Sequence, residues 1–308
     1  MSARLPATLI GGYLGAGKTT LVNALLRGAG GLRLAVLVND FGELPIDADL
    51  IEAREGNLLN ISGGCICCSF GSDLIAAILE LRAARRPIDH LLIETSGVAL
   101  PATIAQSLQL IPDIEVNGIV VLADAETVRA RAADRYMGDT VLAQLASGDL
   151  IVLNKTDLSS PEQISSTTTW LHEVAPRARV VPAQRAGLPP DLILARHAGQ
   201  ITARFLASGH DTAQLATVSF EIDGHGDPEA LGQALAESSL RLLRAKGFVR
   251  DPQGALVALH VMGRRFSVEP ATAQGPGRIV CIGLAHEIDP KALASAIAAC
   301  RPFQARLA

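Results

Sequence analysis

Hydrophobic residues follow a repeating pattern through the first two thirds of the chain, where short apolar runs alternate with stretches of helical periodicity. The runs are rich in Leu, Ile and Val and are apolar at nearly every position, which is typical of strands buried on both faces. This alternation predicts an α/β fold in which helices cover both faces of a parallel sheet. The predicted strands are residues 7–11, 34–39, 90–94, 118–124, 150–155 and 178–183.

Helices are predicted between these strands, at residues 18–27, 73–86, 101–110 and 160–175. The last of them opens with Ser160, followed by Pro161 and Glu162. This is the order expected of an N-cap and a first helical turn, so we place the start of that helix at Ser160.

The pattern changes after residue 206 and divides the chain in two. The small, polar segment 207–214 is the predicted linker, which leaves residues 1–206 as the first domain and 215–308 as the second. Three of the predicted strands in the second part follow one another without a helix between them, which predicts a smaller α+β domain with an antiparallel sheet. Its predicted elements are strands at 216–223, 255–263, 265–270 and 278–285 and helices at 227–247 and 289–300.

Composition narrows the range of partners and compartments. The formal net charge is −4 and the aromatic content 3%, whereas nucleic-acid binders present a basic surface and stacking rings. Nucleic acid is therefore not an expected partner. The sequence has neither an apolar run long enough to cross a membrane nor the features of a signal peptide, so the expected location is the cytoplasm, away from membranes.

Residues 12–19, GYLGAGKT, match the phosphate-binding P-loop pattern and lie between a predicted strand and a predicted helix. Such a loop directs backbone N–H groups and a helix N-terminus at nucleotide phosphates. Lys18 would reach the β- and γ-phosphates, and the Thr19 hydroxyl would bind Mg²⁺, which gives both residues a catalytic role. The predicted nucleotide contacts in this motif are Gly12, Gly15, Ala16, Gly17, Lys18, Thr19 and Thr20.

Two further motifs follow predicted strands. The first of these motifs is NKTD, with Asn154, Lys155 and Asp157. The Asp157 carboxylate can accept two hydrogen bonds from guanine, and adenine has no matching pair of donors. Glu94 and Gly97 belong to the sequence ETSG. There the carboxylate would hold Mg²⁺ and contribute to catalysis, and the glycine N–H would contact the γ-phosphate. The predicted ligand is GTP or GDP.

Three cysteines lie within four positions, at Cys65, Cys67 and Cys68. This spacing is too tight for a disulfide framework and suits a thiolate metal site in a reducing compartment. Three protein ligands leave one tetrahedral position open, which favours metal exchange over permanent storage. Inert buried thiols are the alternative reading, and zinc and cobalt are not distinguished by these ligands.

These motifs together resemble the CobW and nitrile-hydratase-activator group of GTP-dependent metallochaperones. The resemblance runs through GGYLGAGKTT, VNDFGELPID, GGCICC, LLIETSG and NKTD in order, and continues into RAKGFV and VMGRRFSVEP of the second domain. It implies nucleotide contacts at the P-loop and NKTD residues and a metal site at the three cysteines. Family members usually carry glutamate where Asp40 stands, and the resemblance implies that an acid at this position assists metal binding. Asp40 is therefore a candidate fourth metal ligand, with a shorter reach than glutamate.

The sequence thus predicts a slow GTPase that delivers zinc or cobalt to a client metalloprotein under nucleotide control. The expected partners are this client and the nucleotide. The sequence does not decide whether the protein forms a homodimer. One alternative is a regulatory GTPase whose cysteines sense redox state. Another is an interaction module that keeps a P-loop but does not hydrolyse nucleotide.

Overall fold

The structure is a computed structural model that describes residues 4–38, 78, 87–194, 215–271, 275–300 and 303–307. The chain forms two compact units, Ser2–Ala195 and Arg196–Ala308. The predicted linker and most of the predicted helix at 73–86 lie outside the described residues. The predicted boundary between the domains therefore stays a prediction.

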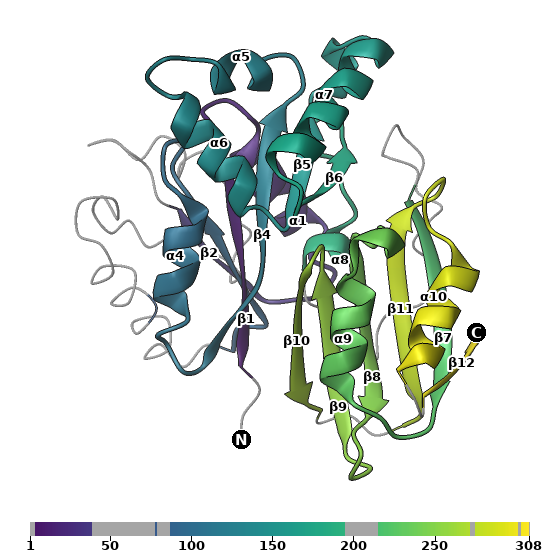
Figure 1. Ribbon diagram of the computed structural model, residues 1–308. Coiled ribbons are helices and arrows are strands. Elements are labelled where there is room, and N and C mark those ends of the chain that lie inside the picture. The colour runs from purple at the N-terminus through teal and green to yellow at the C-terminus, as the bar shows by residue number, and fades with distance from the viewer. Residues whose placement is uncertain are drawn as a thin grey trace. The chain divides into compact units, whose positions relative to one another are not determined.

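The first unit is built on a six-stranded sheet with the order β2-β3-β1-β4-β5-β6. All neighbouring strands are parallel. The predicted α/β fold is confirmed, and the carboxyl ends of the strands share one edge of the sheet (Figure 1). The strands are β1 (Leu5–Gly12), β2 (Leu34–Val38), β3 (His90–Glu94), β4 (Ile114–Asp124), β5 (Leu150–Asn154) and β6 (Arg179–Pro182).

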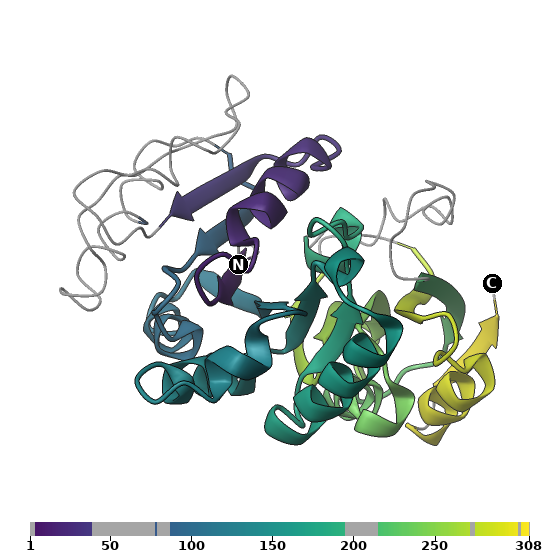
Figure 2. The ribbon, with the colours of Figure 1, turned by 90° about the horizontal axis from the view of Figure 1, so that it is seen from above.

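Helices cover both faces of this sheet, and every residue of β2, β3 and β5 is buried. Helix α1 lies on one face with the short α8, whereas α4, α6 and α7 lie on the other (Figures 1 and 2). The described helices of this unit are α1 (Lys18–Arg27), α4 (Pro101–Leu108), α5 (Val128–Ala132), α6 (Gly138–Ser147), α7 (Pro161–Val174) and α8 (Pro190–Ile193).

The described helices of this unit agree with the sequence prediction in part. Ser160 caps α7 as expected, in a reciprocal pair of hydrogen bonds with Gln163. Helices α5 and α6 were not predicted. Helix α5 is only five residues long, and neither Thr127 nor Met137, which precede the two helices, makes a capping side-chain hydrogen bond. No proline marks the first turn of α5 or α6, as it does in α4 and α7.

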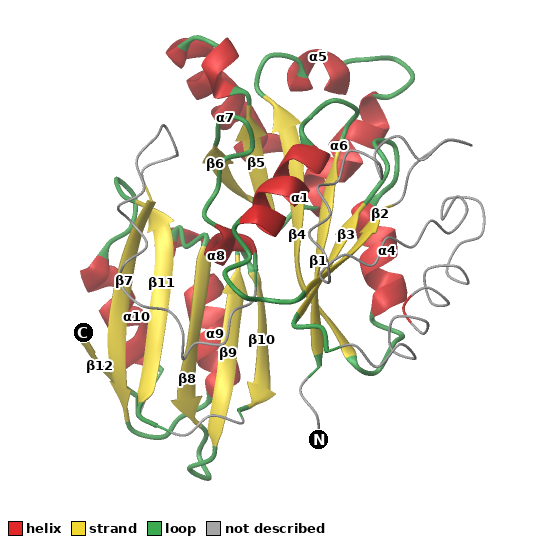
Figure 3. Ribbon diagram, turned by 180° about the vertical axis from the view of Figure 1, so that it is seen from behind, coloured by secondary structure: helices red, strands yellow, loops and turns green. Residues whose placement is uncertain are grey.

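The second unit holds an antiparallel six-stranded sheet with the order β10-β9-β8-β11-β7-β12. Helices α9 (Pro228–Ala236) and α10 (Pro290–Ala299) pack on one face of it, over a core that includes Phe220, Leu259 and Ile279 (Figure 3). The predicted α+β architecture is confirmed. The strands are β7 (Leu215–Asp223), β8 (Arg244–Arg250), β9 (Leu256–Met262), β10 (Arg265–Pro270), β11 (Gly277–Leu284) and β12 (Gln304–Leu307).

The predicted helix at 227–247 is wrong in its second half. Helix α9 ends at Ala236, Glu237 is extended, and Arg244 begins strand β8 between β9 and β11. Leu, Arg, Ala and Lys in this segment are good helix formers, but the strand buries Ala245 and Val249 in the core. Tertiary burial overrides local propensity here.

Candidate functional site

The loop between β1 and α1 has the backbone that phosphate binding requires. Gly12, Gly15 and Gly17 have φ angles of 131°, 76° and 104°, which favour glycine strongly. Gly12 also passes so close to the backbone oxygen of Leu122 that a Cβ would not fit. Helix α1 begins directly after the loop, at Lys18. The loop and the helix N-terminus together form a concentration of N–H groups suited to an anion.

Lys18, Thr19 and Glu94 meet at the start of α1. The Lys18 side chain is buried, and its Nζ lies 3.5 Å from the backbone oxygen of Tyr13. The Thr19 hydroxyl donates to Glu94 Oε1 over 2.8 Å, and Glu94, at the end of β3, is 2% exposed. The structure thus brings together the predicted P-loop lysine, the predicted hydroxyl and the predicted strand-end acid.

The donor set at Thr19 and Glu94 fits magnesium. Both offer hard oxygen atoms, the ligand type that Mg²⁺ prefers, and neighbouring oxygens around an octahedral Mg²⁺ lie about 2.9 Å apart, since each Mg–O bond is about 2.0–2.1 Å. The Thr19 hydroxyl can donate its hydrogen to Glu94 and still offer a lone pair to the ion. The two residues would therefore hold Mg²⁺ beside the nucleotide phosphates.

Asn154, at the end of β5, connects two loops at this edge of the sheet. Its Nδ2 donates to the backbone oxygen of Ala16 over 2.9 Å, and its Oδ1 accepts from the backbone N–H of Ala186 over 2.7 Å. The side chain is 2% exposed. Asn154 therefore holds the P-loop against the loop that follows β6, and in this structure it acts through protein contacts.

Lys155 and Asp157, the other predicted contacts of NKTD, follow Asn154 in the sequence. Lys155 has a left-handed backbone (φ 61°), and its Nζ forms a 2.8 Å ion pair with Asp124 Oδ2 at the end of β4. Asp157 lies in the 3₁₀ turn Thr156–Leu158, with its side chain exposed. The exposed Asp157 carboxylate lies near Lys155, at the same edge of the sheet as the P-loop, and is accessible to the base of a nucleotide.

Loop 183–187 belongs to the site and was not predicted. Arg185 and Ala186 both have positive φ angles, 48° and 52°, although neither is glycine. The backbone oxygen of Ala183 accepts from the Thr156 hydroxyl over 3.0 Å. Left-handed backbone at consecutive non-glycine residues gives no sequence signal, whereas the strand-end acid Asp124 could have been found by the reasoning that identified Glu94.

The end of β3 and the residues after it, 94–99, lie between the P-loop and helix α6. A Cβ on Gly97 would lie 2.5 Å from Leu14 Cδ2 and 2.9 Å from the Leu14 nitrogen, so only glycine allows this close approach. On the α6 side, Gln144 Nε2 donates to the backbone oxygens of Gly97 (3.1 Å) and Ala99 (2.8 Å). Gln144 belongs to no recognised motif, so the sequence does not predict this contact.

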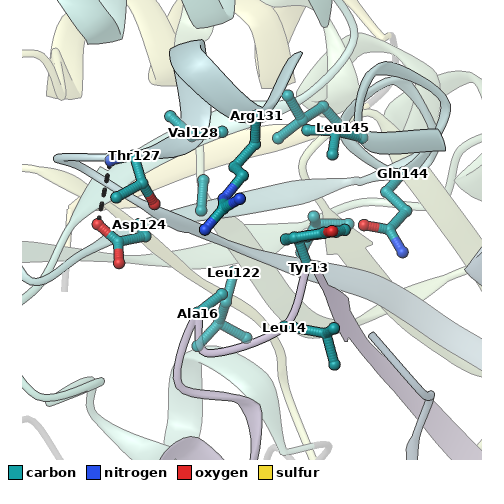
Figure 4. A pocket seen from close by; sticks show the side chains of 13 residues that line it. Tyr13, Leu14, Ala16, Leu122, Asp124, Thr127, Val128, Arg131, Gln144 and Leu145 are labelled. Carbon is teal, nitrogen blue, oxygen red and sulfur yellow. Dashed lines mark hydrogen bonds between the residues drawn. The ribbon is translucent and has the colours of Figure 1, made fainter. Parts of the chain in front are cut away.

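A hollow of about 320 Å³, open to solvent, lies beside the P-loop (Figure 4). Its wall is mostly apolar, with Val128 and Leu145 contributed by α5 and α6. The Arg131 guanidinium lies 5.7 Å from the centre of the Tyr13 ring, within the range of a cation–π contact. This contact attaches the second residue of the P-loop motif to α5.

The predicted transition-metal ligands Cys65, Cys67 and Cys68 and the candidate ligand Asp40 lie outside the described residues. Among the residues that the structure does describe, no group of three or more His, Cys, Asp or Glu side chains could hold a metal ion. The metal site of the sequence analysis thus stays a prediction. Within the described part of the chain, no helix is long and apolar enough to cross a membrane.

Two parts of the chain match known domain families. Residues 6–182 match the family described as CobW/HypB/UreG, nucleotide-binding domain. Residues 215–301 match the cobalamin synthesis protein cobW C-terminal domain. One match falls in each unit, and the second includes β7 to β11 but not β12.

Curated relatives align along nearly the whole chain. The chain is 32% identical to the zinc chaperone CobW of Pseudomonas aeruginosa over 342 aligned positions, which cover 95% of the chain and 90% of the relative. It is 31% identical to the zinc chaperone CobW of a Sinorhizobium species, with 96% and 97% covered. Among solved structures, the Zn(II)-bound YjiA GTPase of E. coli aligns with 98% of this chain and 100% of its own, at 21% identity and a TM-score of 0.49.

Proposed function

Because this chain belongs to the CobW/HypB/UreG family and carries the CobW C-terminal domain, we propose that it is a GTP-hydrolysing metal chaperone. It binds zinc at Cys65, Cys67 and Cys68 and transfers it to a client metalloprotein, and the bound nucleotide controls the transfer.

The hydrogen bond between Thr19 and Glu94 is the observation that carries the hydrolytic part of the proposal. It joins the P-loop to the end of β3 at the point where a phosphate-bound Mg²⁺ needs oxygen ligands. Magnesium, when bound, neutralises charge on the β- and γ-phosphates. Lys18 supplies a second positive charge at the same loop, and we expect the slow intrinsic turnover of P-loop GTPases that act without an arginine finger.

Guanine is the proposed base because Asp157 is exposed at the edge of the sheet that carries the P-loop. Its carboxylate can accept from the N1–H and the exocyclic amine of guanine, whereas adenine has no matching pair of donors. Lys155 is held beside it by Asp124. The proposed nucleotide contacts are those of the P-loop, Gly97 and NKTD.

Zinc is the proposed cargo because the full-length relatives are named zinc chaperones and because thiolates bind this ion well. Three cysteines leave a fourth tetrahedral position for Asp40, for water or for a donor of the client. Free thiolates require a reducing compartment, so we place the protein in the cytoplasm.

Control by nucleotide follows from the order of the motifs along the chain. The cysteines lie between Asp40, in the place of a switch loop, and Glu94. A γ-phosphate that repositions these flanking segments would change how the thiolates converge, and both ligands would then bias one equilibrium. If GTP strengthens zinc binding by some factor, linkage requires that zinc strengthen GTP binding by the same factor, typically about 5- to 150-fold.

A single set of titrations tests the proposal. Zinc affinity is measured under reducing conditions for the wild type and for the Cys65→Ala, Cys67→Ala, Cys68→Ala triple variant, each loaded with GDP or with a non-hydrolysable GTP analogue. The wild type should bind zinc with different affinity in the two states, and the triple variant should bind nucleotide but no zinc. Phosphate release from GTP should be lost in Lys18→Ala.

Each failure of this experiment has a distinct meaning. Equal zinc affinity in both nucleotide states would reject nucleotide control. Absence of zinc binding by reduced protein, together with oxidation-dependent hydrolysis, would favour a redox-sensing GTPase. Absence of phosphate release from the wild type would reject the GTPase itself.

A further inference from the structure

Gln144 is a buried polar side chain in the middle of α6, outside every nucleotide-binding motif of the chain. It is 1% exposed, and its Nε2 donates to the backbone oxygens of both Gly97 and Ala99. An amide group has two N–H donors, so these two bonds use its full donor capacity. The contact joins α6 to a segment that lies 45 to 47 positions earlier in the chain.

The segment that Gln144 holds is fixed on its other side by the P-loop. Glu94 accepts from the Thr19 hydroxyl at its start, and Thr95 N donates to the backbone oxygen of Ile10 over 2.9 Å. Gly97 then lies directly against the Leu14 backbone. The segment is therefore held between the phosphate-binding loop and the side chain of Gln144.

We infer that Gln144 is a positioning residue for GTP hydrolysis, which holds the Gly97 N–H in the orientation that meets the γ-phosphate. Glycine has more backbone freedom than any other residue, and the bond from Gln144 to its carbonyl adds to the restraint that Leu14 places on Gly97. Gln144 acts through Gly97 and does not itself touch the nucleotide. The inference rests on the proposed GTPase function and names one more residue on which that function depends.

The chemistry of the contact explains why glutamine is needed. A leucine of similar size would leave two backbone carbonyls without their donors, which costs more than the bonds themselves contribute. A glutamate would place a carboxylate against two carbonyl oxygens and could donate only when protonated. The two variants therefore fail for different reasons and respond differently to pH.

The test compares Gln144→Leu and Gln144→Glu with Ser147→Ala in the full-length protein. Ser147 lies one turn further along α6, and its hydroxyl donates within the helix, to the backbone oxygen of Gln144 at 2.6 Å. For Gln144→Leu we expect kcat to fall about tenfold or more, and the affinity for a non-hydrolysable GTP analogue to fall with it. Affinity for GDP, which has no γ-phosphate, should stay within about twofold of the wild type, and Ser147→Ala should match the wild type throughout.

The glutamate variant supplies a readout that general loss of packing would not produce. Its activity relative to the wild type should rise as the pH falls from 8 to 6, because a protonated carboxyl regains one donor. Equal loss of GDP and analogue affinity in Gln144→Leu, or wild-type kinetics in both variants, would overturn the inference. If the wild type itself released no phosphate, the proposed function would fail, and the ratio of analogue to GDP affinity would still test Gln144.

Discussion

Thr19 and Glu94 are joined by a 2.8 Å hydrogen bond although they lie 75 positions apart in the sequence. The bond links the first turn of α1 to the end of β3, and Glu94 is buried there. A buried carboxylate is costly unless it is hydrogen-bonded or binds a cation. The pair is therefore suited to Mg²⁺, and each member can be tested by itself.

Glu94→Gln should lower the rate of GTP hydrolysis by about 10²–10³-fold, because an amide keeps the shape of the carboxylate but loses its charge toward Mg²⁺. Single-turnover phosphate release across a Mg²⁺ titration measures this effect. Glu173→Gln, an exposed change on α7, is the matched control and should behave as the wild type. Unchanged Mg²⁺ dependence in Glu94→Gln would show that the carboxylate does not bind the ion.

Asn154→Ala should weaken nucleotide binding, because it removes the links from β5 to Ala16 and Ala186. Each lost hydrogen bond to a buried group costs about 1–3 kcal/mol, so affinity for GDP should fall at least fivefold and unfolding should require less denaturant. Calorimetry and denaturant titration measure the two effects.

Asn117→Ala is the control for this prediction. Asn117 Nδ2 donates to Thr8 Oγ1 and to the backbone oxygen of Ile193, in the interior of the same unit. Its loss should lower stability by a similar amount while GDP affinity stays near that of the wild type. If both variants lost affinity equally, Asn154 would act only through overall stability.

Asp157→Asn should change the preferred base. The wild type should bind GTP much better than ATP, and the variant should shift toward xanthosine nucleotides, whose ring presents an acceptor where guanine has a donor. A bidentate base contact is worth about 1–3 kcal/mol, or roughly 5- to 150-fold. Competition binding measures the preference, with the exposed Asp139→Asn as the control. Equal affinity of the wild type for GTP and ATP would contradict the guanine assignment.

Stability of the second unit should depend on Cys281 at alkaline pH. Burial raises the pKa of the Cys281 thiol to about 12, whereas an unfolded cysteine has a pKa of about 8.5. The folded state keeps the proton longer, so this contribution to stability is complete below about pH 8.5 and is lost as the pH rises toward 12.

Replacing Cys281 with alanine should remove this part of the pH dependence. Between pH 9 and 11 the free energy of unfolding of the wild type should fall more steeply than that of Cys281→Ala, by up to about 1.4 kcal/mol per pH unit. Denaturant titrations at several pH values measure the difference. Parallel curves for the two proteins would contradict the assignment of this slope to the thiol.

Local patterns were enough to predict the parts of the site that are contiguous in sequence. The strand, loop and helix around Lys18 and the acid at Glu94 lie where their motifs placed them, because parallel strands bring their carboxyl ends to one edge. The role of Gln144 could not be predicted, because its partners are distant backbone oxygens. Every residue has a backbone oxygen, so the sequence does not indicate which ones accept a hydrogen bond. Ala186 was missed because its contact with Asn154 is made by its backbone N–H, which every residue except proline has.

The limits of local sequence patterns also explain the errors in the predicted fold. Residues 244–247 have the composition of a helix, and only the core around β8 makes them a strand. Helix α5 has only five residues, and no proline marks the first turn of α5 or α6 as it does in α4 and α7. Burial against distant elements decides the first case, and single-sequence patterns carry little information about such burial.

The link from Asn154 to Ala16 spans 138 positions of the chain, and Ala186 lies further still toward the C-terminus. A ribosome must therefore release most of the first unit before the P-loop can take its final shape. Contacts so distant in sequence form late and slow the folding of a newly made chain. Cellular GTP would bind only the completed unit and stabilise it by mass action, so the nucleotide would also select chains whose synthesis and folding have been finished.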